Sequence, residues 1–114
     1  MAIRFFTSDS AGLLAEIKRL IRAGEIETWI VDGDGDFTHT TSGEQWKNRA
    51  FLRPSRMDDR LLLNIIIHKD EKQKREVYAI YHGRFIEMAV RHVPSLFSTA
   101  VATPSFTKED QDLN

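Results

Sequence analysis

The sequence predicts an α+β protein of two layers, in which two helices pack on one face of a mainly antiparallel sheet. Between residues 25 and 81, short segments rich in β-branched and aromatic residues alternate with turn signals, which is typical of a meander. Two other segments, one on each side of that region, carry apolar residues at helical spacing. The predicted order is β-α-β-β-β-β-β-α, with residues 95–103 as either a final short strand or a packed loop.

The N-terminal part of the chain predicts a strand followed by a helix. Residues 2–7 have the composition of a strand, and residues 8–10 offer side-chain oxygens that can cap a helix. Gly24 suits the position just after the helix. The residues that give the apolar face of this helix are Leu13, Leu14, Ile17, Leu20 and Ile21.

Residues 25–32 and 37–41 predict a β-hairpin. The Asp-Gly pairs between them supply the positive φ angles that tight hairpin turns require. After a loop at residues 42–48, residues 49–57 predict an extended strand that contains Pro54. Because proline cannot donate to a ladder, this strand should lie at an edge or carry a bulge.

Residues 61–67 predict the central strand, because both of its faces are mainly apolar and must be buried. Asn64 is the one polar residue within it, and a buried amide must find partners or line a pocket. Residues 69–75 predict a charged loop, and residues 76–81 predict the returning strand. Beyond Gly83, apolar residues at helical spacing from Phe85 to Val93 predict the second helix.

Length and composition favour one soluble domain at residues 1–103, followed by a polar tail at residues 104–114 that should fray. The chain has no cysteine, which fits a reducing compartment and favours a cytoplasmic location. No apolar run approaches the ~20 residues of a membrane span, so no membrane is expected.

A mixed basic and aromatic segment at residues 46–60 is the first candidate contact surface. Trp46, Arg49, Arg53 and Arg56 could together contact phosphates and stack on bases. Strand alternation, however, divides the cations between two faces. A charged strand that resists edge-to-edge aggregation is therefore the favoured interpretation.

The most acidic feature is the cluster of Asp32, Asp34 and Asp36, a weak candidate for a metal site. A helix–loop–helix calcium site needs glycine at its sixth position and glutamate at its twelfth. Here those positions hold Phe37 and Gly43. A plain hairpin turn is therefore favoured, and we predict no metal and no cofactor.

Tyr81, His82 and Arg84 form the last candidate, at the predicted junction between the returning strand and the second helix. Such a junction can hold an anion at the helix N-terminus, although no glycine-rich phosphate loop accompanies it. No nucleophile signature is present, so no catalytic residue is predicted.

Three hypotheses of function follow. The favoured one is a non-enzymatic interaction module that binds another protein or a second copy of itself, since a central strand apolar on both faces needs more cover than two helices on one face supply. The alternative is weak binding of nucleic acid or another polyanion through residues 46–60. The third is a small enzyme with a cleft near residues 78–84.

Overall fold

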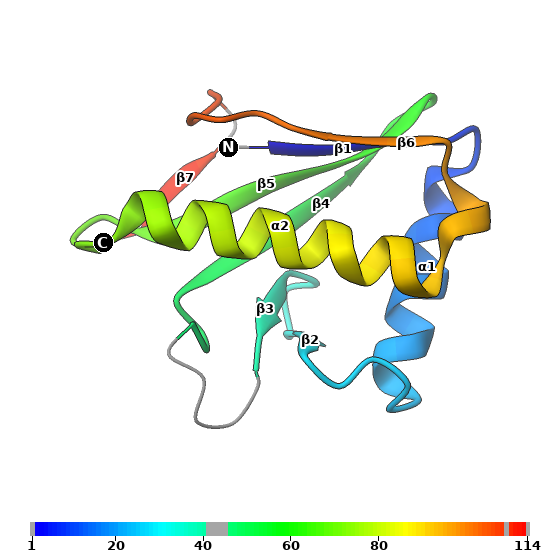
Figure 1. Ribbon diagram of the computed structural model, residues 1–114, viewed down its shortest axis with the longest axis horizontal. Helices are drawn as coiled ribbons and strands as arrows, with labels where there is room; N and C mark the ends of the chain where they lie inside the picture. Colours follow the sequence, from blue (N-terminus) through cyan, green and yellow to red (C-terminus); the bar gives the residue numbers. More distant parts are fainter. Residues whose placement is uncertain (1, 41–45, 109, 114) are drawn as a thin grey trace.

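Strand β5, Arg60–His68, is the centre of a seven-stranded sheet in the computed structural model, which describes residues 2–40, 46–108 and 110–113 (Figure 1). The strand order is β2-β3-β4-β5-β1-β6, and β7 pairs in parallel with β5 on the side that β1 occupies further along. The other elements are β1 Ala2–Phe6, α1 Ser10–Arg22, β2 Trp29–Val31, β3 Phe37–His39, β4 Ala50–Arg56, α2 Lys74–His92, the 3-10 helix η1 Pro94–Leu96, β6 Thr99–Ala102 and β7 Gln111–Leu113.

The prediction of a central strand with buried residues on both faces is confirmed by β5. Alternate residues from Leu61 to Ile67 are completely buried and belong to the hydrophobic core that both helices share. On the opposite face, Asn64 and Ile66 are only 6% and 3% exposed. The strand is flanked by β4 along most of its length and by β1 over residues 60–64.

Helix α1 forms where the sequence predicts it, and its ends have clear causes. The Asp9 side chain caps the first turn by accepting a hydrogen bond from the Gly12 N–H at 2.9 Å. Gly24 follows the helix with a φ of +80°, a conformation that favours glycine. The apolar face made of Leu13, Ile17 and their neighbours is buried against the sheet.

The predicted strand at residues 76–81 is wrong, because this segment forms the first half of helix α2. Val77, Tyr78 and Tyr81 are buried at helical spacing, and Phe85 continues the same stripe. Gly83 does not interrupt the helix, although glycine in a helix interior costs about 1 kcal/mol relative to alanine. The second helix therefore begins at Lys74, well before Phe85.

With residues 76–81 in a helix, the antiparallel meander ends with β5, and β6 returns to pair with β1. Both helices lie on the same side of the sheet, so the predicted α+β fold with helices packed on the sheet is confirmed (Figure 1). The prediction that the strand with Pro54 lies at an edge is wrong, because β4 pairs with both β3 and β5. Its pairing with β3 is at Leu52, and Pro54 lies beyond that point. Proline is tolerated there because it lies where that neighbour has ended.

The two hairpin strands, β2 and β3, are shorter in the structure than the sequence predicts. The first hairpin strand begins at Trp29, so residues 25–28 form a connection between α1 and β2. Residues 42–45 of the predicted loop lie outside the described part of the chain.

Within the described residues, no helix combines the length and the apolar character that a membrane crossing requires.

Aromatic rings at the centre of the core join the helices to the sheet. Phe85 of α2 contacts Trp29 and Phe37 with both ring centroids at 5.1 Å, and Phe5 at 6.0 Å. All three contacts are edge-on or tilted, which is the arrangement that aromatic quadrupoles prefer. Phe85 thus connects α2 to three strands.

Candidate functional site

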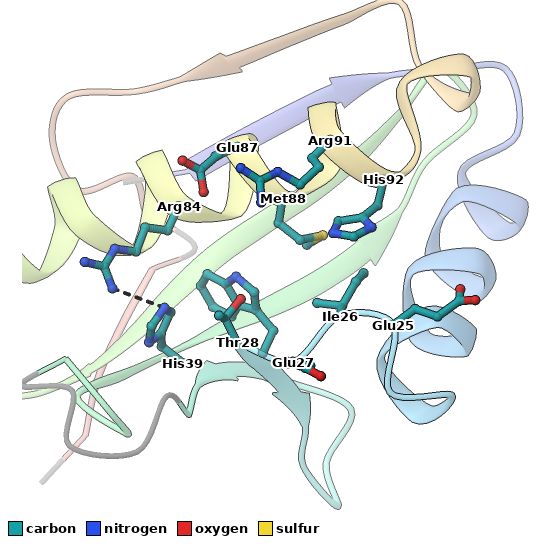
Figure 2. A pocket seen from close by; sticks show the side chains of 11 residues that line it. Glu25, Ile26, Glu27, Thr28, His39, Arg84, Glu87, Met88, Arg91 and His92 are labelled. Atoms are coloured by element: carbon teal, nitrogen blue, oxygen red, sulfur yellow. Dashed lines mark hydrogen bonds between the residues drawn. The ribbon is translucent and has the colours of Figure 1, made fainter.

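A cleft of about 580 Å³ lies between α2 and the connection that leads into β2, and Figure 2 shows its lining. Its floor is apolar, because the buried residues Ile26, Trp29 and Met88 face it. Its rim carries Glu27 and Glu87 together with arginines of α2. Because both signs of charge are mixed at the rim, the cleft has no concentrated field for an anion or for a cation.

One polar contact in the cleft joins α2 to β3. The Arg84 guanidinium lies 3.3 Å from the Nε2 atom of His39, which is 2% exposed (Figure 2). A guanidinium has no acceptor, so the imidazole nitrogen accepts this hydrogen bond. Arg84 therefore lines the cleft, as the hypothesis of a cleft near residues 78–84 requires, while Tyr78 and Tyr81 do not line it.

The predicted position of His82 at a helix N-terminus is wrong. His82 lies inside α2, eight residues after the helix begins, and it is 2% exposed. Its Nδ1 atom is 2.7 Å from the carbonyl oxygen of Tyr78, one turn earlier. The N–H groups at the start of α2 belong to residues 73–76, because the Val77 N–H already donates to the Gln73 carbonyl oxygen at 2.9 Å, so His82 lies outside that kind of anion site.

Three of the predicted contact residues meet around one hydroxyl group. The Tyr81 hydroxyl donates to the Trp46 carbonyl oxygen at 2.6 Å and accepts from the Arg49 backbone N–H at 3.0 Å. The Arg49 guanidinium lies 5.5 Å from the Trp46 ring centroid and forms a two-pronged ion pair with Glu71 at 2.7 Å. We call Trp46, Arg49, Glu71 and Tyr81 the Tyr81 cluster, and its contacts stabilise the fold.

We expect the substitution Tyr81→Phe to lower the free energy of unfolding by about 1–2 kcal/mol, because it removes the hydroxyl that bonds both the Trp46 carbonyl oxygen and the Arg49 backbone N–H. The ring itself is retained, so the packing against Trp29 is unchanged. Urea denaturation at neutral pH measures the effect. An unchanged midpoint would contradict the structural role of the Tyr81 cluster.

The other basic residues of the 46–60 segment lie beside α1. Arg53 and Arg56 line a groove of about 620 Å³ together with Lys18 and Arg22. Two carboxylates line the same groove, and one of them, Asp36, forms a two-pronged ion pair with Arg53 at 2.8 and 3.0 Å. Intramolecular pairing of this kind reduces the positive charge that a polyanion would meet.

The three aspartates of the hairpin turn have oxygen atoms within 4.8 Å of one another. The backbone N–H groups of Asp34 and Asp36 donate to one Asp32 carboxylate oxygen, which is the hydrogen bonding of a turn. Asp36 is also neutralised by Arg53. The cluster is explained by the turn and carries no ligand assignment.

Asn64 joins the C-terminal segment to the central strand. Its side-chain amide donates to Thr107 Oγ1 and to Asp110 Oδ1, both at 3.0 Å, and the Ile65 backbone N–H donates to the same carboxylate at 2.8 Å. Burial acts to raise the pKa of Asp110, but hydrogen bonds to its carboxylate, including those from Asn64 and the Ile65 N–H, bring the pKa below its usual value. Asn64 thus positions the described part of residues 104–113 beside β5.

The outer edge of β6 is a surface that the sequence did not single out. Within the described residues, β6 is the last strand of the sheet and pairs with β1 alone (Figure 1). Val101 is 39% exposed, and Leu96 and Phe106 on either side are 37% and 41% exposed. Residues 93–107 contain no charged residue, in a chain that is 29% charged. That uncharged run was the signal available in the sequence.

Comparison of the chain with protein-family models gives no match, and no curated protein and no solved structure matches it. Function must therefore be inferred from the geometry of the residues themselves.

Proposed function

We propose that this protein is an interaction module of the cytoplasm. Its protein partner would contribute a β-strand that pairs with the outer edge of β6. The observation that carries the proposal is the exposed and uncharged state of this edge. Natural sheets often protect such edges with charges or prolines, and β6 itself, Thr99–Ala102, contains neither, so it offers a template for another strand.

The hydrogen-bonding groups that a partner would use can be identified from the pairing with β1. The Thr103 backbone N–H donates to the Ala2 carbonyl oxygen at 2.9 Å, so residue 103 directs its groups toward β1. Because the direction alternates along an antiparallel strand, Val101 also faces β1, whereas Ala100 and Ala102 face outward. The N–H and C=O groups of these two alanines form the proposed docking edge.

The opposite edge of the sheet is less suitable for strand addition. Strand β2 has only three residues, and charged residues flank it at Glu27 and Asp32. Charges beside a short edge strand are a common protection against pairing with another chain. Of the two ends of the strand order, β6 is therefore the better docking site.

A test is available in the pair of substitutions Ala102→Pro and Val101→Pro. Proline at 102 removes an outward N–H, so it should abolish strand addition while leaving the fold intact. Proline at 101 removes a hydrogen bond to β1, so it should lower the melting temperature instead. The probe is a capped peptide with the sequence of residues 97–104, followed by amide NMR shifts of the full chain.

We expect the peptide to shift the amide signals of Ala100 and Ala102 in the native chain and to leave the Ala102→Pro variant unaffected. Circular dichroism and the melting temperature confirm that the variant is folded. If the peptide causes no shifts at β6 at any concentration, or shifts a different surface, β6 is not a docking edge.

A further inference from the structure

We infer that the strand added to β6 is β6 of a second copy, so that two sheets join across a two-fold axis at Val101. This inference rests on the proposed function, in which β6 is the docking edge. The two copies would form one continuous sheet through an antiparallel pair of identical strands, as an isologous interface requires.

The register of this pair follows from the direction of the backbone groups. With Ala100 and Ala102 facing outward, a two-fold axis at Val101 places Ala100 of one copy opposite Ala102 of the other. Each such pair exchanges both of its N–H···O bonds, so every outward group is used. The two Val101 residues then form the non-hydrogen-bonded pair, with Cα atoms about 4.5 Å apart.

The lack of charge argues for a second copy in particular. In a two-fold interface the residue on the axis meets its own copy, so a charge there meets a like charge, and a run of like charges around it is repelled by its own copy. Residues 93–107 meet this condition, because none of them is charged. An edge selected for a different, charged partner would gain from a complementary charge, and this segment offers none.

Exposed apolar side chains at both ends of the edge fit the same symmetry. Leu96 and Phe106 lie five residues before and after Val101, and each is more than one-third exposed. Antiparallel pairing about Val101 places the Leu96 end of one copy beside the Phe106 end of the other. A four-residue strand pair makes a small interface, so we expect a weak dimer.

Cysteine cross-linking tests the axis directly, because the chain has no natural cysteine. In the Val101→Cys variant the two sulfur-bearing residues would face each other at a Cα separation within the disulfide range of roughly 4.4–6.8 Å. Val90→Cys is the matched control, since Val90 is 53% exposed but lies on α2. Mild oxidation should yield a covalent dimer of the first variant and at least tenfold less of the second.

Sedimentation equilibrium of the unmodified chain gives a second readout. We expect a monomer–dimer equilibrium with a dissociation constant in the micromolar to millimolar range, and we expect Ala102→Pro to abolish most of the dimer. Adding Ala102→Pro to Val101→Cys should also abolish the cross-link. Circular dichroism of each variant separates lost pairing from lost folding.

The outcomes separate the two proposals. A strict monomer whose β6 amides still bind the 97–104 peptide overturns self-association and leaves the docking edge in place. A monomer that binds no peptide overturns both. A dimer that resists Ala102→Pro, with no preferential cross-link at Val101, shows that the copies meet elsewhere and overturns self-association through β6, while the peptide experiment still decides the docking edge.

Discussion

The substitution Phe85→Ala is expected to lower the free energy of unfolding by about 3–5 kcal/mol, the usual cost of emptying a large aromatic site in a packed core. Phe85 is completely buried, and its ring contacts Trp29, Phe37 and Phe5. Those partners lie on three strands, so they cannot all move to fill the cavity. The loss equals a large part of the stability of an ordinary domain. Chemical denaturation followed by tryptophan fluorescence measures it.

Val90→Ala is the matched control for this substitution, because Val90 lies on the exposed face of the same helix. We expect this change to remain within about 0.5 kcal/mol of the unmodified chain. If both substitutions had similar small effects, Phe85 would not be the contact that joins α2 to the sheet.

The second large effect is a loss of stability in acid that depends on Glu71. The hydrogen-bonded Arg49 guanidinium lowers the pKa of Glu71 from 4.5 to about 2. Because the pKa is lower in the folded chain than in the unfolded chain, the ion pair stabilises the fold fully above about pH 4.5. This contribution is lost as the pH falls from about 4.5 to about 2.

The Glu71 side chain is 10% exposed, whereas Arg49 is 29% exposed, so solvent screening reduces the benefit. We therefore expect a contribution of about 2 kcal/mol, less than the full shift in pKa implies. When the pH is lowered from about 6 to about 2, the free energy of unfolding of Glu71→Gln should fall by about 2 kcal/mol less than that of the unmodified chain. Urea denaturation at a series of pH values measures the difference.

Glu76→Gln serves as the control for the acid experiment, since Glu76 is exposed in the first turn of α2. Its pH profile should parallel that of the unmodified chain. Identical acid profiles for Glu71→Gln and the unmodified chain would show that the ion pair with Arg49 contributes nothing to folding.

The candidate residues show which of their contacts can be predicted from the sequence. The sequence predicts Trp46, Arg49 and Tyr81 as contact residues, and they do meet, but around a buried hydroxyl that bonds two backbone groups. The sequence predicts Arg53 as a cation for phosphate contact, and in the structure it forms an ion pair with Asp36 of the hairpin turn. Residue type indicated that these side chains make strong polar contacts. Whether each contact is internal or external depends on which segments the fold brings together.

The sequence by itself determined the elements whose apolar spacing and turn residues fit one kind of secondary structure only. An almost continuous apolar run gave β5 its central place, a single apolar stripe with a cap and a terminal glycine defined α1, and Asp-Gly pairs defined the hairpin turn. Tertiary structure decided that residues 76–81 are helical. Their apolar residues are compatible with a strand or a helix, and the helix is identified only when Val77, Tyr78 and Tyr81 are buried on the same face as Phe85. It also decided which strand ends the sheet, since an edge exists only once all strands have paired. The physical reason is that local periodicity is a property of neighbouring residues, whereas burial and strand pairing depend on residues far apart in the chain.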